Sequence, residues 1–392
     1  MDASELREIL STEGLRLLDE VPAWDSKDDV MRIVTDLRKA GHSPALVAAV
    51  VSQARLRARG VAKFGPFATS MLFTEAGLEQ ATRLRVAAMH AGRFRDAGLT
   101  NIVDLGCGIG ADALAIASLE MDVTAVDIDE VTAAVASFNL APWPGATVVH
   151  ADAMSVDLSP FDGVYLDPAR RSASKKRLAD PADWTPSLDF AFGIGADKPT
   201  GVKLGPGIDR DLIPDGAEAQ WISVDRDVVE VGVWFGAVAR AGITRAALVI
   251  GEHGTAELTA PADSPDEAPG TLGEFLYEPD GAVIRARLIG DLARTLGGRM
   301  LDPQIAWITA DEAHVTPFAQ GFRVAETFPF DERKLKQALA ARGIGTLEIK
   351  KRGIDVDPAQ LRKKLSLKGD RSATLILTRV AGKRLAILAD RL

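Results

Sequence analysis

Residues 101–127 read NIVDLGCGIGADALAIASLEMDVTAVD, and the fold of the chain follows from this stretch. A short apolar run, Ile102–Leu105, leads into three alternating glycines, which precede a helical segment, Ala111–Leu119, and a second apolar run, Val123–Asp127. Short apolar runs that alternate with helical segments are typical of a parallel sheet with helices packed against it. The stretch therefore predicts an α/β fold.

The same alternation continues to residue 250. A helix is predicted at Glu130–Phe138, and three further strands are predicted at Thr147–His150, Gly163–Asp167 and Gly201–Leu204. Two more apolar runs, Trp221–Phe235 and Arg245–Ile250, are expected to complete the sheet as an antiparallel pair. The α/β core is predicted to span residues 98–255.

Residues 1–97 show a different pattern of apolar residues from this core. Apolar residues recur there at helical spacing, and no strand pattern interrupts them. The region is expected to end in one long amphipathic helix over Glu75–Ala97. It is therefore predicted to be a helical N-terminal region that leads into the sheet.

The chain is also too long, at 392 residues, for one ordinary domain. Glu257–Gly270 is crowded with proline and acidic residues and is interpreted as a loop. Residues 256–321 are expected to hold a small ferredoxin-like α/β segment with elements at Glu274–Tyr277, Ile284–Leu296 and Ile305–Thr309. Residues 322–392 show a β-α-β-α-β-β pattern and are predicted to form a basic C-terminal α+β domain.

Composition restricts the class of protein. A single cysteine, Cys107, excludes an internal disulfide and is typical of a reducing compartment. The five histidines are scattered, so no metal site is expected. No apolar run approaches the ~18 residues that a membrane span requires, and the acidic, polar N-terminus does not resemble a signal peptide. These features predict a cytoplasmic protein without metal and without membrane contact.

Three glycines, Gly106, Gly108 and Gly110, lie at the turn between the first strand and its helix. Their spacing lets backbone amides approach a ligand that any side chain would obstruct. The pattern is G-x-G-x-G after Asp104, rather than the G-x-G-x-x-G of dinucleotide sites. Asp104 can hold the ammonium group of a ligand. The alternative for the three glycines is a tight turn that binds no ligand.

Two further acids strengthen the ligand hypothesis. Asp127 ends the second strand, where a carboxylate can accept hydrogen bonds from both hydroxyls of a ribose. Asp152 follows the third strand, where it can bind an adenine amino group. Either acid alone would be interpreted as a helix cap. With Ile128 and Ala153 beside them, these residues and Asp104 predict a site for a ligand that is part amino acid and part nucleoside.

The chain here resembles the class I S-adenosylmethionine-dependent methyltransferases. The resemblance is carried by Asp104–Gly110, Val126–Asp129 and Ala151–Asp152. It implies a Rossmann-like core, S-adenosyl-L-methionine as the cofactor, and the cofactor-binding residues named above. The segment Ala136–Leu140 is similar to the A-x-x-N segment of members that modify nucleic acids.

The same resemblance assigns the acceptor site to Tyr165–Arg171, after the fourth strand. Methylases of amino groups carry D/N-P-P-Y/F/W there. This chain keeps Asp167 and Pro168 but has Ala169 and Arg170 in place of the second proline and the aromatic residue. The resemblance therefore implies methylation of a nitrogen, with catalytic roles for Asp167, Pro168 and Arg170, but base stacking by this loop does not follow from it. Two substrate contacts are expected nearby, from Arg171 and Trp184.

The segment Lys63–Thr82 is similar to the segment before the core of trimethylguanosine-synthase-like enzymes, which closes over cofactor and substrate. Gln80 and Thr82 are candidates to face the pocket, and helix positions that pack on the core are the alternative. Lys203, in the middle of the fifth strand, is expected to be paired or to extend its ammonium group to the surface.

Charge is distributed unevenly. The chain has a net charge of −9, but Arg323–Leu392 carries 17 Lys and Arg against 8 Asp and Glu, which is +9 and leaves −18 for the rest. This stretch resembles the THUMP-like domain at the C-terminus of a bacterial methyltransferase family, which implies RNA as a partner. Positive charge favours RNA independently, because Lys and Arg displace phosphate counterions. The predicted contacts are Lys350, Lys351, Arg352, Arg362, Lys363 and Lys364.

Taken together, these patterns predict a methyltransferase that acts on a base nitrogen in structured RNA. Two alternatives stay open. The acceptor is a protein or a small molecule, in which case the basic domain is only a solvated surface. Alternatively, the core binds S-adenosylmethionine without turnover, and the chain is an RNA-binding module.

Overall fold

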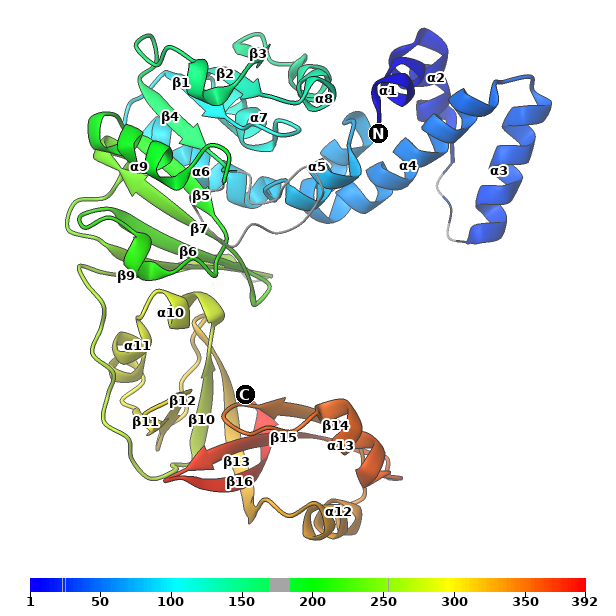
Figure 1. Ribbon diagram of the computed structural model, residues 1–392. Helices are drawn as coiled ribbons and strands as arrows, with labels where there is room; N and C mark the ends of the chain where they lie inside the picture. Colours follow the sequence, from blue (N-terminus) through cyan, green and yellow to red (C-terminus); the bar gives the residue numbers. More distant parts are fainter. Residues whose placement is uncertain (23, 25, 169–183, 253) are drawn as a thin grey trace. The chain divides into compact units, whose positions relative to one another are not determined.

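The computed structural model describes residues 1–22, 24, 26–168, 184–252 and 254–392 (Figure 1). Two compact units make up the chain. Unit 1 comprises Met1–Leu204 and Trp234–Ala239, and unit 2 comprises Gly205–Val233 and Arg240–Leu392. The four-part division expected from the sequence stays a prediction. Within the described ranges, no helix combines the length and apolar character that crossing a membrane demands.

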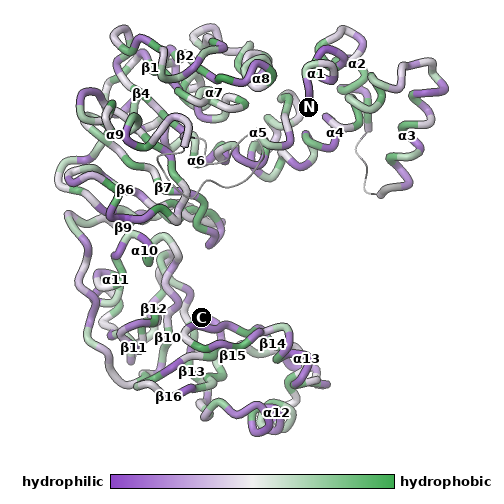
Figure 2. The backbone as a smooth tube through the Cα atoms, viewed as in Figure 1, coloured by the Kyte–Doolittle hydropathy of each residue, from purple (hydrophilic) through white to green (hydrophobic). Residues whose placement is uncertain are grey.

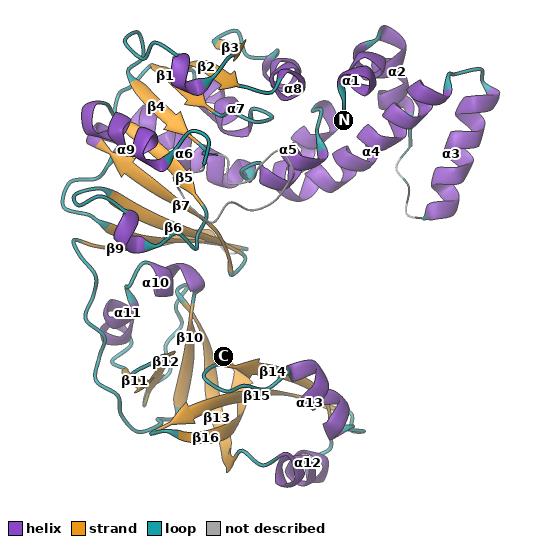
Figure 3. Ribbon diagram, in the orientation of Figure 1, coloured by secondary structure: helices purple, strands orange, loops and turns teal. Residues whose placement is uncertain are grey.

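Helices form the N-terminal part of unit 1 (Figure 3). They are α1 Ala3–Leu10, α2 Thr12–Glu20, α3 Lys27–Lys39, α4 Pro44–Phe64, the 3₁₀ turn η1 Gly65–Ser70, α5 Glu75–Gln80 and α6 Leu84–Asp96. In Figure 2 these helices carry both hydrophilic and hydrophobic residues, as helices with one buried face do. Ser43 caps α4, and Pro44 occupies its first turn, where a missing N–H costs nothing.

The single helix predicted over Glu75–Ala97 is wrong, because the chain leaves the helix between α5 and α6. Lys63 of α4 caps this break, because its ammonium donates to the carbonyl oxygens of Glu79 and Ala81, at 2.7 Å each. These carbonyls would otherwise lack partners at a helix end. The break turns Thr82 into the core, where it is buried.

The Rossmann-like sheet predicted from residues 101–204 is present. Its strands are β1 Asn101–Leu105, β2 Asp122–Asp127, β3 Ala146–His150, β4 Gly163–Leu166 and β5 Thr200–Leu204, and its helices are α7 Ala111–Ser118, α8 Glu130–Leu140 and α9 Leu188–Asp197. The strands pair in parallel in the order β3-β2-β1-β4-β5. The order reverses between β1 and β4, and ligands of such sheets bind outside the carboxyl ends of the strands at this reversal.

Four more strands extend this sheet in the order β7-β6-β8-β9. They are β6 Glu218–Val224, β7 Asp227–Phe235, β8 Arg245–Gly251 and β9 Gly254–Ala260. The expected antiparallel pair is wrong, because β8 pairs in parallel with β6 and antiparallel with β9. The run Trp221–Phe235 is divided by Asp225 and Arg226, which both adopt a left-handed backbone with φ of 49° and 73°. The loop predicted at Glu257–Gly270 begins only after β9.

Unit 2 also holds a seven-stranded sheet in the order β11-β12-β10-β13-β16-β15-β14. Its elements are β10 Phe275–Pro279, α10 Gly281–Arg285, α11 Ile289–Thr295, β11 Arg299–Asp302, β12 Ile305–Ala310, β13 Ala319–Pro329, α12 Glu332–Ala341, β14 Ile344–Lys351, α13 Pro358–Leu365, β15 Arg371–Val380 and β16 Lys383–Arg391. The β-α-β-α-β-β order predicted for the basic region is confirmed. The helix predicted at Ile284–Leu296 is divided into α10 and α11, and β11 was not predicted.

Candidate active site

The glycine turn between β1 and α7 has the backbone that the sequence led us to expect. Gly106, Gly108 and Gly110 have φ of 85°, 56° and 84°, which other residues rarely adopt. A Cβ atom at Gly106 would lie 3.2 Å from the carbonyl oxygen of Asp167, at the end of β4. The turn is therefore packed directly against the start of the predicted acceptor loop.

Asp104 lies in β1 beneath this turn and is buried, with 1% of its surface exposed. Within the part of the chain that the structure describes, neither carboxylate oxygen has a hydrogen-bond partner. Burial, followed by the nearby charges of Asp112 and Asp167, holds the pKa of Asp104 well above its ordinary value. A buried carboxylate without a partner is costly in a protein, so a cationic or hydrogen-bonding ligand fits this position.

Asp127 ends β2, and two backbone amides orient its carboxylate. Gly108 N donates to Oδ2 and Asp129 N donates to Oδ1, both at 2.9 Å. Burial raises the pKa of Asp127, although these two hydrogen bonds oppose the shift. Each oxygen keeps a further lone pair, so the oriented carboxylate can still accept hydrogen bonds from a ligand. Ile128, next to it, is 60% exposed.

Asp152 follows β3 and is exposed. Its Oδ1 accepts a hydrogen bond from Met154 N at 2.9 Å and caps the short 3₁₀ helix η2, Ala153–Ser155. The helix-cap interpretation of this residue therefore holds, and it is compatible with ligand binding through the other oxygen. Because the strands are parallel, Asp104, Asp127, Asp152 and Asp167 all lie toward one edge of the sheet.

Asp167 directly follows β4 and is paired with Lys203 of β5, whose ammonium nitrogen lies 2.5 Å from Asp167 Oδ2. The pairing expected for Lys203 is therefore confirmed. The Asp167 side chain is 32% exposed, whereas Lys203 is almost fully buried. Pro168, the next predicted catalytic residue, is buried. The pair places an ionic group at the edge of the sheet, with its anionic half toward solvent.

Lys203 belongs to a buried polar network that sequence reasoning missed. Its ammonium donates to Thr82 Oγ1 at 2.9 Å, and the Thr82 hydroxyl donates to Asp112 Oδ2 at 2.6 Å. His90 Nδ1 lies 2.8 Å from Asp112 Oδ1 and 2.9 Å from the Tyr165 hydroxyl. The network thus joins α6, α7, β4 and β5 behind the candidate acceptor site.

Asp112 is fully enclosed in this network. Burial raises its pKa, but the hydrogen bond and charge of His90, the charge of Lys203 and the hydroxyl of Thr82 together hold it below the ordinary value. The sequence contained one signal for it. Asp112 is the only charged residue of α7, whose sequence is otherwise Ala, Leu, Ile and Ser, and a lone charge on an apolar helix needs a partner when it is buried.

The remaining predicted residues near the core differ in where the structure places them. Arg170 and Arg171 lie outside the described residues. Trp184 is buried. Of the two pre-core candidates, Gln80 is exposed at the end of α5, and Thr82 is buried in the network described above.

The basic residues Lys350, Lys351 and Arg352, at the end of β14 and directly after it, divide into two groups. Lys350 Nζ lies 2.7 Å from Glu278 Oε2 and 5.6 Å from the centre of the Phe322 ring, so it is packed as well as paired. Arg352 lies 3.6 Å from the other oxygen of Glu278. Lys351, between them, is exposed. Only Lys351 of this run therefore presents its charge chiefly to solvent.

Helix α13 presents three consecutive exposed cations, Arg362, Lys363 and Lys364. Arg362 Nε donates to the carbonyl oxygen of Leu347 at 3.2 Å, and Lys364 pairs with Glu332 of α12 at 3.1 Å. Exposed cations held in this way remain accessible to a polyanion. Among the described residues, no group of three His, Cys, Asp or Glu side chains is arranged to hold a metal ion.

Three protein-family models match the chain. A methyltransferase domain matches residues 102–176, a THUMP domain-like family matches residues 319–391, and a domain of unknown function (DUF8688) matches residues 2–60. The first match includes the glycine turn and β4. The second coincides with β13–β16 and their two helices.

Known proteins extend this likeness over most of the chain. An uncharacterized S-adenosylmethionine-dependent methyltransferase of Mycobacterium tuberculosis, recorded for two strains, is 34% identical over 352 residues, which is 86% of this chain and 94% of the relative. A crystal structure described as a methyltransferase from Porphyromonas gingivalis covers 94% of this chain and 100% of its own, with 21% identity and a TM-score of 0.70, and supports the fold alone.

Proposed function

Because this chain belongs to the S-adenosylmethionine-dependent methyltransferases, we propose that it transfers the methyl group to a base nitrogen in structured RNA. The observation that carries the acceptor chemistry is the Asp167–Lys203 pair, which places an oriented carboxylate at the carboxyl end of β4, against the glycine turn. The proposal of RNA rests on the basic domain.

We assign the cofactor to the glycine turn and the three acids beside it. The backbone amides of Gly106, Gly108 and Gly110 would approach it closely. Asp104 would bind the ammonium group of the cofactor. This group would be the hydrogen-bond donor that the buried carboxylate lacks among the described residues. The preoriented Asp127 carboxylate would accept hydrogen bonds from both ribose hydroxyls. The remaining contacts, with the adenine, would come from Asp152, Ile128 and Ala153.

S-adenosylmethionine supplies a methyl group that its sulfonium has already activated, so the protein chiefly has to align the acceptor. Asp167 would accept a hydrogen bond from an N–H of the acceptor and turn the nitrogen lone pair toward the methyl carbon. The new N–C bond would form as the S–C bond breaks, and the proton lost by the nitrogen would pass to water. Lys203 would favour the ionised, accepting form of Asp167.

The C-terminal domain would bind the RNA backbone. Its exposed cations Lys351, Arg362 and Lys363 lie on β14 and α13 of a domain that matches the THUMP domain-like family. Few aromatic residues interleave the basic residues, which favours phosphate contacts over base stacking. The acidic remainder of the chain would contribute little to this binding.

Nucleoside mass spectrometry of RNA from a strain that lacks the gene tests the proposal. We expect one methylated nucleoside to disappear and to return with the intact gene but not with Asp167→Ala. Asp197→Ala, which removes an exposed carboxylate at the end of α9, is the matched control and should restore it. An unchanged nucleoside profile would refute RNA as the substrate. Labelled methyl groups in the protein fraction would then favour a protein acceptor, and S-adenosylhomocysteine binding without label in either fraction would favour a binding module.

A further inference from the structure

An extended segment, Met71–Phe73, runs between the helical region and the core and is held by two side-chain amides. Leu72 and Phe73 are both fully buried. Asn139 of α8 binds both backbone groups of Leu72, with Leu72 N donating to Oδ1 at 2.8 Å and Nδ2 donating to Leu72 O at 3.0 Å. Gln53 of α4 binds both backbone groups of Phe73, at 3.1 and 2.7 Å.

These paired contacts supply hydrogen-bond partners for buried backbone groups. Buried backbone N–H and C=O groups need hydrogen-bond partners, and an extended segment outside a sheet has none from neighbouring strands. Each carboxamide supplies one acceptor and one donor, as a neighbouring strand would. One amide comes from the helical region and the other from the core, so the segment joins the two.

Asn139 also reaches the glycine turn. Its Nδ2 donates to the carbonyl oxygen of Ile109 at 2.9 Å. From the other side, Gly77 of α5 packs on the Ile109 side chain, and a Cβ at Gly77 would lie 2.4 Å from Ile109 Cγ2. Ile109 stands between Gly108 and Gly110. The turn is therefore held at its backbone by Asn139 and at its side chain by α5.

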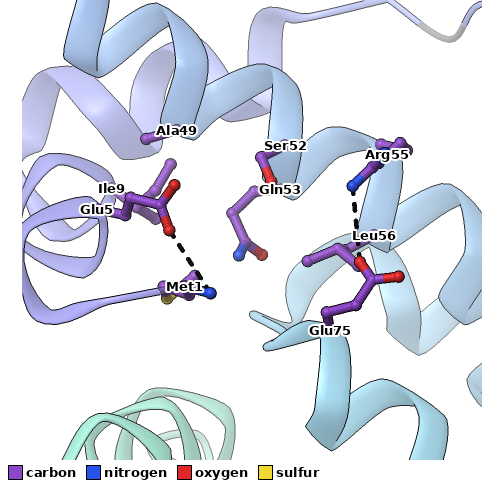
Figure 4. A pocket seen from close by; sticks show the side chains of 9 residues that line it. All are labelled: Met1, Glu5, Ile9, Ala49, Ser52, Gln53, Arg55, Leu56 and Glu75. Atoms are coloured by element: carbon purple, nitrogen blue, oxygen red, sulfur yellow. Dashed lines mark ion pairs between the residues drawn. The ribbon is translucent and has the colours of Figure 1, made fainter.

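Gln53 is embedded in the helical region, with 1% of its surface exposed. Figure 4 shows it extending from α4 toward the space between α1 and α5. This space is a pocket of about 180 Å³, and its lining includes Gln53 and the neighbouring Ser52 of α4. One turn further along α4, Arg57 Nε donates to Met71 O at 2.9 Å. The helical region thus holds the segment at both ends, Met71 and Phe73.

We propose that the helical region of residues 2–60 serves to preorganise the glycine turn for the cofactor, through the connection Gln53–Phe73–Leu72–Asn139–Ile109. Gln53 and Asn139 are then positioning residues for cofactor binding. A turn with three left-handed glycines loses much conformational freedom when it is ordered. Holding Ile109 beforehand lowers that cost and raises affinity. The inference rests on the assignment of the cofactor to this turn and is independent of the acceptor.

Calorimetric titration with S-adenosylhomocysteine, together with thermal unfolding of the unliganded protein, tests this inference. Gln53→Ala and Asn139→Ala each remove two or more hydrogen bonds, and we expect each to weaken binding about tenfold. Amide hydrogen exchange at Gly108–Gly110 should accelerate in both unliganded variants. Ser52→Ala, a change at the neighbouring pocket residue, is the control and should leave affinity and exchange unchanged.

Two further variants cover the case in which an alanine variant does not fold. Gln53→Glu and Asn139→Asp keep the side-chain shape but replace the amide donor by a second acceptor oxygen, and both should weaken binding. The inference is overturned if the Gln53 variants lower the unfolding temperature but keep the affinity within twofold of the unaltered chain. Asp127→Ala distinguishes a failure of the positioning role from a failure of the cofactor assignment. If Asp127→Ala also leaves the affinity intact, the cofactor does not bind at this turn at all.

Discussion

The carboxylate of Asp104 is buried in β1, and among the described residues it lacks a hydrogen-bond donor. Burial raises its pKa in the folded protein well above the ordinary value of ~3.9 that applies to the unfolded chain. The folded state therefore binds more protons than the unfolded state between these two values. Stability falls as the pH rises through this interval and stays reduced above the folded-state pKa. Ionised Asp104 therefore costs the unliganded fold stability, and the proposed ammonium group of the cofactor would offset this cost.

We predict that Asp104→Asn stabilises the unliganded protein at pH 7 and weakens S-adenosylhomocysteine binding. The gain in unfolding temperature should shrink as the pH is lowered toward 4, where the protonated Asp104 of the unaltered chain is also neutral. Thermal unfolding from pH 4 to pH 8 measures the gain, with Asp197→Asn as the control. Equal unfolding temperatures at every pH would show that burial of Asp104 carries no such cost.

A second residue-level prediction concerns Gly106, whose φ is 85° and whose added Cβ would approach Asp167 O to 3.2 Å. Gly106→Ala should destabilise the protein by about 1 kcal/mol through backbone strain and should weaken S-adenosylhomocysteine binding at least tenfold. Gly98→Ala is a matched control, because Gly98 has a φ of 74° with open space around its Cβ position. Gly98→Ala should lose a similar amount of stability through backbone strain but keep its affinity for S-adenosylhomocysteine. Equal affinities for the two variants would contradict a role of this turn in the site.

At the scale of elements, the network around Asp112 ties α6 and α7 to β4 and β5. The pKa of Asp112 lies below its ordinary value, because His90, Lys203 and Thr82 outweigh the effect of burial. Its contribution to stability is therefore present above the unfolded-state pKa and is lost only as the pH falls through the lowered folded-state pKa.

Asp112→Asn should lower the free energy of unfolding by about 3 kcal/mol at pH 7, because it removes a buried carboxylate that accepts a hydrogen bond from Thr82, contacts His90 and lies near the charge of Lys203. Urea unfolding at pH 7 measures the loss. Asp122→Asn, at the exposed start of β2, provides the comparison and should cost little. A loss well under 1 kcal/mol for Asp112→Asn would show that the network contributes little to stability.

These elements also show where sequence reasoning works and where it stops. β1, β2 and the glycine turn could be predicted because their signal is local: apolar runs, glycines and acids follow one another in the chain. The break between α5 and α6 could not, because Lys63 of another helix satisfies the carbonyls that end α5. The parallel pairing of β6 with β8 depends on a distant partner. The roles of His90 and Tyr165 in the network were missed for the same reason, since each arises only by tertiary contact, whereas the lone charge of Asp112 on an apolar helix was a local signal.

At the scale of the whole molecule, the charge of the C-terminal domain carries the RNA proposal. Of the predicted contacts there, Lys350 and Arg352 are paired with Glu278, whereas Lys351, Arg362 and Lys363 are exposed. The exposed three are therefore the better candidates for phosphate contacts, and the paired two also lie over the rings of Phe322 and Trp307. Substituting only the exposed residues tests binding without disturbing the core of this domain.

The triple change Lys351→Gln, Arg362→Gln and Lys363→Gln should weaken RNA binding and reduce the slope of log affinity against log salt by about 2. Binding of S-adenosylhomocysteine should be unaffected. Fluorescence anisotropy with labelled RNA at several salt concentrations provides both quantities. The control changes three exposed cations of the helical region, Arg7→Gln, Arg38→Gln and Lys39→Gln. An equal loss of affinity in both triple variants would place RNA binding elsewhere.

The cofactor is proposed to bind at the stretch Asn101–Asp127, and the acceptor site is placed relative to it. Calorimetric titration of Asp127→Ala with S-adenosylhomocysteine tests this cofactor site most directly, beside Asp122→Ala at the other end of β2. Loss of two hydrogen bonds to an ionised group should weaken binding roughly a hundredfold in Asp127→Ala, while Asp122→Ala binds as the unaltered chain does. Undiminished affinity in a folded Asp127→Ala variant would contradict the cofactor site and, with it, the acceptor geometry built on that site.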